Sequence, residues 1–282
     1  MEFVKSLGES AKNLLGGAAA GGGEQSGDAQ ETHAVLDPMA CVSCSDPCEE
    51  HPWVEGAMLA KLDMEKPLRC KKRARRVFFI CSGMRGSEWS AKIGKDVSLN
   101  SSKLDRVTQA FSKALKTSAN HNAILYVCSE EALDINQRED EVDLLVFPDH
   151  IRVRNANVDQ FSQLLAGKID QSQSAPIPQK HVLFVCTHSK RDNRCGKAGI
   201  LTFNALVDQA EQDDNILVSE QSHVGGHAFA GNVLAFPGGD LFGRVRPCHA
   251  HLLIEQYCRN GMAPSPEIYR GQLLVVDDNE LF

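Results

Sequence analysis

The chain repeats one pattern of expected strands and helices, and this repeat constrains the fold more than any single motif does. Residues 76–82 (RVFFICS) and 182–187 (VLFVCT) are short apolar runs that reach a cysteine, as buried strands would. We expect each run to be followed by an amphipathic helix, a strand, a strand pair with a tight turn and a closing helix. These elements are expected at 104–115, 123–129, 144–155 and 157–166 in the first half, and at 200–210, 215–220, 233–247 and 249–260 in the second. Each half is therefore predicted to be β-α-β-β-β-α.

This order predicts a mixed sheet covered by helices, because it needs one crossover helix for a parallel strand pair and one hairpin for an antiparallel pair. It is the order of a thioredoxin-like fold. The predicted fold class is α/β, with two tandem thioredoxin-like domains at 76–168 and 181–282 and a linker at 169–180. Residues 1–40 are expected to form a disordered or weakly amphipathic tail, and 41–75 a lead-in segment that contains cysteine and histidine.

The composition is typical of a soluble globular protein. Of the 282 residues, 42% are hydrophobic and 24% charged, and no apolar run reaches the ~18 residues of a membrane-spanning helix. The net charge of −7 argues against nucleic acid as a partner, because phosphate binding needs a basic surface. Ten cysteines favour a reduced compartment with buried or metal-bound thiols, so a cytoplasmic location is expected. A mitochondrial location is the alternative, since residues 1–15 could form a short amphipathic helix, although they contain no arginine.

The second half carries two cysteines and two histidines in a pattern typical of metal ligands. Eight residues separate Cys186 from Cys195, and His223 and His227 lie four residues apart around a glycine pair. Two soft thiolates and two borderline imidazoles, brought together by the fold, would form a metal site. The glycines would let the chain bend so that both imidazoles face one point. These ligand types alone leave both zinc and iron open as the metal.

The repeat allows the two halves to be compared position by position. Cys81 occupies the position of Cys186, but the first half has Ser90 where the second has Cys195. The first half also has no His-x-Gly-Gly-His motif. We therefore expect only the C-terminal domain to hold a metal. Cys81 and Cys128 are interpreted as buried core cysteines, which is the usual state of free cysteine.

A second group of ligand-type residues precedes the repeat. Cys41, Cys44, Cys48 and His51 fall within eleven residues. At this spacing a tetrahedral zinc could order a segment that has little other structure. The alternative is a solvent-facing loop whose thiols bind nothing.

His188 is the main competitor for the histidine ligands of the second half. It follows Cys186 by two residues, as in the Cys-x-His half of a Rieske site, but the matching Cys-x-x-His is missing. The pair His223 and His227 is therefore preferred, because its motif is complete.

The complete pattern resembles the sucrase/ferredoxin-like family over most of residues 45–270. The resemblance rests on Cys-x8-Cys, on His-x-Gly-Gly-His, on Phe-Ala-Gly-Asn-Val at 229–233 and on Gly-Arg-Val at 243–245. It implies a thioredoxin-like ferredoxin with a 2Fe-2S cluster and bis-histidinyl ligation. The ligands that it implies are Cys186, Cys195, His223 and His227.

The resemblance and the ligand chemistry together predict an electron-transfer protein with a role in cellular redox homeostasis. Two ferric ions, two sulfides and two thiolates make a neutral oxidised site, whereas four thiolates would make it doubly negative, so an electron enters more easily. Potentials of roughly −150 to +300 mV are expected, against about −400 mV for plant-type clusters. Imidazoles that lose a proton on oxidation would make the potential pH-dependent, so that proton and electron move together.

The expected partners are a redox protein, either a reductase or an electron acceptor, and the cluster-delivery machinery. For that machinery the resemblance implies recognition of an aromatic residue at the C-terminal tail, here Phe282. A non-enzymatic carrier or redox sensor is expected rather than an enzyme, because no nucleophile–base pair or substrate pocket is apparent from the sequence. Two alternatives stay open. One is a structural zinc module with the same four ligands, and the other is a thioredoxin-like thiol oxidoreductase.

Overall fold

The computed structural model describes residues 62–275 except 64, 96, 99, 119–121 and 135. All of these residues belong to one compact unit, Asp37–Phe282. The predicted tail at 1–40, Phe282 and the second candidate metal site lie outside the described residues. That site consists of Cys41, Cys44, Cys48 and His51. None of the helices in the described part combines the length and the apolar character that a membrane span requires.

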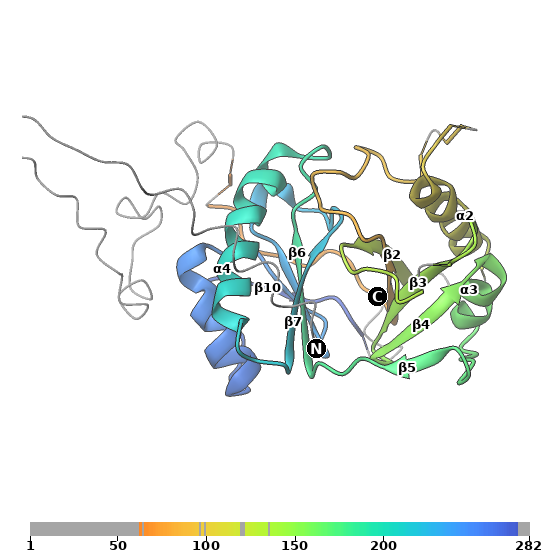
Figure 1. Cartoon of the computed structure of the whole chain (residues 1–282). Helices are drawn as coiled ribbons and strands as arrows, with labels where there is room; N and C mark the ends of the chain where they lie inside the picture. Colours follow the sequence, from red (N-terminus) through yellow and green to blue (C-terminus); the bar gives the residue numbers. More distant parts are fainter. Residues whose placement is uncertain are drawn as a thin grey trace, which may run out of the picture. The chain divides into compact units, whose positions relative to one another are not determined.

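The described part has the element order of the predicted repeat (Figure 1). The first half contains β1 (Arg76–Cys81), α2 (Lys103–Thr117), β2 (Ala123–Cys128), β3 (Val142–Phe147), β4 (Ile151–Ala156), α3 (Val158–Leu165) and β5 (Ser174–Pro176). The second half contains β6 (His181–Cys186), the π-helix η3 (Cys195–Gly199), α4 (Ile200–Ala210), β7 (Ile216–Gln221), the 3₁₀-helices η4 (His227–Phe229) and η5 (Pro247–His249), β8 (Val233–Phe236), β9 (Asp240–Phe242), the π-helix η6 (Leu252–Arg259) and β10 (Tyr269–Gln272). The order β-α-β-β-β-α is confirmed in both halves, and each half ends with an additional strand.

Local capping explains where the helices of the first half begin. The Ser102 hydroxyl accepts the backbone N–H of Asp105 at the start of α2. Asn157 and Gln160 form a reciprocal capping box at the start of α3. Both helices bury one apolar face against the sheet, with Phe111 and Phe161 stacked on each other at a centroid distance of 4.5 Å.

The ten strands of the described part form one mixed sheet in the order β10-β9-β8-β6-β7-β2-β1-β3-β4-β5. β1 pairs with β2 and β6 with β7 in parallel, as the crossover helices require, whereas the other pairs are antiparallel. The strand order of one half is the reverse of the other, and the halves meet where Cys128 pairs with Gln221. The mixed α/β fold is thereby confirmed, while the division into two thioredoxin-like domains stays a prediction. Residues 169–180, predicted as a linker, contain β5.

The two halves share a hydrophobic core as well as the sheet. Phe79 of β1 stacks on Phe184 of β6 at a centroid distance of 3.7 Å, and Phe147 of β3 stacks on Phe236 of β8 at 3.9 Å. All four rings are fully buried in one cluster. Since β1 and β6 are not neighbours in the sheet, the sheet must fold over itself near the junction of β2 and β7. The helices lie on the outer faces, with α2 and α3 on one half and α4 and η6 on the other (Figure 1).

Candidate metal centre

Three of the predicted ligands meet at the carboxyl ends of two adjacent strands. Cys186 ends β6, Cys195 begins η3, and His223 lies two residues after β7. β6 and β7 are parallel neighbours, so their carboxyl ends share one edge. His223 Nδ1 lies 3.6 Å from Cys195 Sγ and 3.9 Å from Cys186 Sγ. Their donor atoms all lie within 4.8 Å of one another. In the described part of the chain, this is the one group of three or more cysteine, histidine or acidic residues that could hold a metal ion.

The two thiols are buried, lie outside any disulfide and are hydrogen-bonded to each other. A hydrogen bond from the Cys195 thiol lowers the pKa of Cys186 well below its usual value, and contact with His223 acts in the same direction. The same hydrogen bond, together with burial, raises the pKa of Cys195. The lowered pKa of Cys186 favours its thiolate, which is the form that binds metal.

His227 lies beside this group without joining it. Its ring stacks on that of His223 at a centroid distance of 5.5 Å, and its side chain is 46% exposed. Its Nδ1 lies 3.5 Å from a carboxylate oxygen of Asp192, and the Arg194 guanidinium holds that carboxylate through two hydrogen bonds of 2.9 Å. Burial lowers the pKa of His227, whereas Asp192 acts to raise it. A carboxylate on one ring nitrogen is typical of a histidine whose other nitrogen binds metal.

The loop between the two histidines depends on its glycines and on Arg270. Gly225 and Gly226 have φ values of +95° and +71°, in the left-handed region that favours glycine. Arg270 donates to the Gly225 carbonyl oxygen and to the Asn232 side chain. The Asn232 side-chain amide in turn donates to the Gly226 carbonyl oxygen at 3.2 Å, and the backbone carbonyl oxygen of Asn232 accepts the backbone N–H of Cys186 at 2.9 Å. Arg270 thus links the histidine loop to β6, a role that the sequence did not indicate.

This chain matches a known family over most of its length. Residues 68–271, well over half of the chain, match the sucrase/ferredoxin-like family. The chain belongs to this family. The matched region includes all four predicted ligands of the second half and Arg270, so the resemblance seen in the sequence is confirmed.

Curated relatives of this chain carry the name altered inheritance of mitochondria protein 32. The protein from Debaryomyces hansenii is 35% identical over 100 residues, which make up 33% of this chain and 36% of the relative. The protein from Saccharomyces kudriavzevii is 32% identical over 163 residues, or 52% of this chain and 51% of the relative. This chain therefore spans about half or less of the length of these relatives.

Among solved structures, thioredoxin-like [2Fe-2S] ferredoxins from Aquifex aeolicus are similar to part of this family member. The wild-type protein is 16% identical, with a TM-score of 0.30, and the match covers 33% of this chain and 99% of the ferredoxin. A further structure from the same organism is 15% identical with a TM-score of 0.32, covering 37% and 99%. A likeness of this size says nothing about ligands or function.

His188 lies apart from the three-ligand group. Its Nε2 is 2.9 Å from the Ser90 carbonyl oxygen, and its ring packs edge-on against Trp89 at a centroid distance of 5.6 Å. These contacts bury His188 against the first half of the sucrase/ferredoxin-like chain. The structure thus places His223, and not His188, with the two cysteines.

The equivalent positions of the first half offer no comparable site. Cys81 and Cys128 pair directly across β1 and β2, and both are buried free thiols. Burial raises the pKa of Cys128 well above its usual value, so it stays protonated. Ser90 donates its hydroxyl to Asp105 at 2.8 Å. The interpretation of Cys81 and Cys128 as core cysteines is confirmed.

The three grouped donors fit a metal bound by thiolate and imidazole. Bonds of ~2.3 Å to sulfur and ~2.05 Å to nitrogen place two ligands of one tetrahedral metal about 3.6 Å apart. The separations of 3.6 and 3.9 Å between His223 Nδ1 and the two sulfurs agree with this value. A 2Fe-2S cluster requires a fourth ligand, and His227, stacked on His223, is the candidate.

Proposed function

We propose that this protein is an electron carrier or redox sensor whose C-terminal half binds a 2Fe-2S cluster. The proposed ligands are Cys186, Cys195, His223 and His227. The observation that carries the proposal is the buried contact of two thiols and an imidazole at adjacent strand ends, with a second imidazole stacked beside them. Membership of a family that is named for its likeness to ferredoxins supports it.

Residues of this chain would set how easily the site accepts an electron. When bound, the cluster would supply one-electron chemistry and carry no net charge in the oxidised state. Lys72 and Arg270 interact electrostatically with the Cys186 thiolate, so their positive charge would favour the added electron. His227 is half-exposed, so its imidazole can exchange a proton with solvent. The potential is therefore expected to fall as the pH rises, since loss of this proton favours the oxidised site.

Partners and location belong to the same proposal. An electron carrier requires a reductase or an acceptor, and its cluster must come from the cluster-delivery machinery. The proposed location is the cytoplasm. The name of the relatives, which refers to the inheritance of mitochondria, supports the mitochondrial alternative.

Optical and EPR spectra of the anaerobically purified protein, recorded before and after dithionite, test the proposal. We expect two irons and two sulfides per chain and a Rieske-like reduced signal. His223→Cys and His227→Cys should each lower the potential and shift the signal toward the plant type, because a thiolate adds negative charge. His188→Cys is the matched control and should leave the signal unchanged. Protein from iron-supplied cells that contains neither iron nor sulfide would overturn the proposal.

A structural zinc site is the second candidate, and the ligand spacing favours it. The separations between His223 Nδ1 and the two sulfurs suit ligands of a single ion. Such an ion would tie the ends of β6 and β7 together without redox chemistry. Stoichiometric zinc in a colourless protein would support this candidate, whereas iron with acid-labile sulfide would exclude it.

A further inference from the structure

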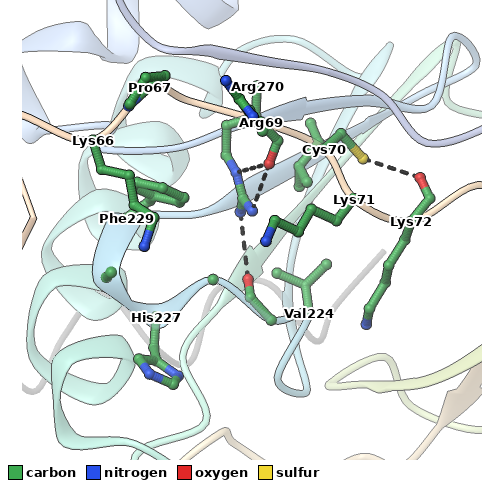
Figure 2. Close-up of a pocket in the computed structure, with 14 residues that line it drawn as sticks. Lys66, Pro67, Arg69, Cys70, Lys71, Lys72, Val224, His227, Phe229 and Arg270 are labelled. Atoms are coloured by element: carbon green, nitrogen blue, oxygen red, sulfur yellow. Dashed lines mark hydrogen bonds between the residues drawn. The ribbon is translucent and has the colours of Figure 1, made fainter.

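A pocket of about 590 Å³ lies beside the histidine loop of the metal centre (Figure 2). Small-molecule sites typically have volumes of ~300–1,000 Å³. Val224, Phe229 and Leu241 give this pocket apolar walls, and His227 also lines it. The described lining includes no aspartate or glutamate. The pocket therefore has the size and the apolar walls of a ligand site and lacks acidic groups.

Basic side chains gather around this pocket, although the chain as a whole has a net charge of −7. They are Lys66, Arg69, Lys71, Lys72 and Arg270. Of these five residues, only Lys66 has a carboxylate of the described part within ion-pair distance, that of Asp63 at 3.9 Å. The local positive charge is thus not a consequence of overall composition, and the described part of the protein leaves most of it without a carboxylate partner.

Two of these cations lie over the glycine pair of the histidine loop. A Cβ added at Gly225 would lie 3.7 Å from Lys72 Nζ, and the Arg270 guanidinium fills the space of a Cβ at Gly226. Arg270 is only 8% exposed, and its guanidinium donates to the carbonyl oxygen of Gly225 and to that of Arg69, beside which Figure 2 shows it. The Cys186 thiolate is the negative group that Lys72 and Arg270 share, and one negative charge does not balance two cations, so a bound anion would stabilise this arrangement.

We propose that this pocket binds a small organic anion, with a carboxylate or phosphate group at Lys72 and Arg270 and an apolar body against Phe229. Because His227, at the end of this loop, also lines the pocket, the anion would bind directly beside the metal centre. The cations would favour ligands with a negative charge, and the apolar walls would favour organic anions over small inorganic ones. This inference does not depend on which metal the centre holds.

Cys70 reports on the pocket, because it is a partly buried free thiol that lines it. Its thiolate can be alkylated by iodoacetate, an anion, or by iodoacetamide, which is neutral; in both reactions an S–C bond forms and iodide leaves. We expect the rate ratio of iodoacetate to iodoacetamide to be at least about tenfold higher at Cys70 than at Cys248, which is also partly buried. The ratio cancels differences in thiolate fraction between the two cysteines. Mass spectrometry of the full-length protein resolves both sites.

Variants connect this ratio with the charge in the pocket. Lys72→Met should lower the ratio at Cys70 several-fold, because it removes one cation and keeps the length of the side chain. Lys113→Met, on the exposed face of α2, is the matched control and should leave the ratio unchanged. Equal ratios at Cys70 and Cys248 in the unmodified protein would overturn the proposal.

Protection of Cys70 from iodoacetamide identifies the chemistry of the ligand. Benzoate or phenyl phosphate should slow alkylation at lower concentrations than inorganic phosphate does, and the better of the two tells a carboxylate from a phosphate ligand. Neutral benzamide should not protect. Protection by a glutamate-rich peptide alone, with no effect of benzoate or phenyl phosphate, would overturn the proposal in favour of an acidic protein partner.

Discussion

At the scale of single residues, burial decides which histidines can carry charge. His249 is only 7% exposed, and its Nδ1 accepts the backbone N–H of Arg246 at 3.3 Å. Burial lowers the pKa of His249 to about 4, and the charge of Arg246 acts in the same direction. His249 therefore stays neutral in the folded protein at pH values where an unfolded chain would already have taken up a proton.

His249 is expected to make the protein less stable in acid. An unfolded histidine takes up a proton near pH 6.5, whereas His249 does so at about pH 4 in the folded state. Its contribution to the free energy of unfolding is fully present above pH 6.5, decreases as the pH falls, and is lost below pH 4. The difference in pKa corresponds to about 3 kcal/mol in total, of which about 2 kcal/mol is lost between pH 7 and pH 5.

Urea unfolding of the unmodified protein and of His249→Gln at pH 7 and pH 5 measures this contribution. Glutamine keeps an acceptor for the Arg246 N–H but cannot take up a proton near neutral pH. The variant should lose about 2 kcal/mol less than the unmodified protein between the two pH values. Acid release of a metal bound at the proposed centre would affect both proteins and cancel in the comparison. Equal losses would show that another group causes the acid sensitivity.

The grouping of three centre ligands could be predicted from the sequence, whereas the residue that holds their loop could not. Cys186 and Cys195 are close in sequence, and a strand-turn-helix order explains why they meet. Arg270 reaches Gly226 only because β10 and the histidine loop lie close together in the folded chain. No spacing or composition signal marks such a contact. His227 was expected to join the three donors but lies at their side, stacked on His223.

At the scale of elements, the loop between β7 and η4 positions both histidines, and its shape depends on one close approach. The guanidinium of Arg270 packs against Gly226 where any other residue would carry a Cβ. Gly167, after α3, has a similar φ of +78°, but an added Cβ there would meet no atom within 4 Å. The two glycines therefore share the backbone conformation and differ in their surroundings.

Gly226→Ala should destabilise the protein more than Gly167→Ala does. Alanine costs about 1–2 kcal/mol of backbone strain at each position, because both have positive φ. At Gly226 the new Cβ would also displace Arg270 from its hydrogen bonds, for a further ~1–3 kcal/mol. Urea unfolding and metal loss to a chelator measure the two effects, and only Gly226→Ala should lose metal faster. Equal behaviour of the two variants would show that Arg270 moves aside freely and does not hold the loop.

Elements with a clear hydrophobic period could be predicted, and the shortest ones could not. β5 has three residues and lies within the predicted linker, and β10 has four residues including Gly271. Neither has the alternation of apolar and polar residues that would mark a strand in the sequence. Each is held in place by pairing with the edge of a neighbouring strand. The helix expected at 249–260 is present, but it is a π-helix over Leu252–Arg259. The same apolar stripe fits either helix type, so sequence periodicity does not distinguish them.

At the scale of the whole molecule, the first half contributes to the structure around the candidate metal centre of the second half. Glu220 of β7 is fully buried and accepts hydrogen bonds from Thr187, next to Cys186, and from the backbone of Gly86 in the first half. The repeat was visible in the sequence, but the packing of one half on the other was not. A strand buried on both faces has the same apolar pattern whether its second face meets a helix or another sheet.

Unfolding of the two halves is expected to be a single transition, because they share a sheet and a core. Phe161 is fully buried on the helix side of the first half, where it packs edge-on against Phe78 at a centroid distance of 5.0 Å. Phe161→Ala should cost about 3–5 kcal/mol. Phe161 belongs to the core cluster of the first half and not to that of the metal centre. Metal release in urea should nevertheless shift to the same lower urea concentration as the loss of circular dichroism.

Phe242→Ala is the matched variant in the second half, where Phe242 is fully buried on the helix side. It should shift both signals in the same way. Independent tandem domains would behave differently: Phe161→Ala would then split the transition in two and leave the urea concentration of metal release unchanged.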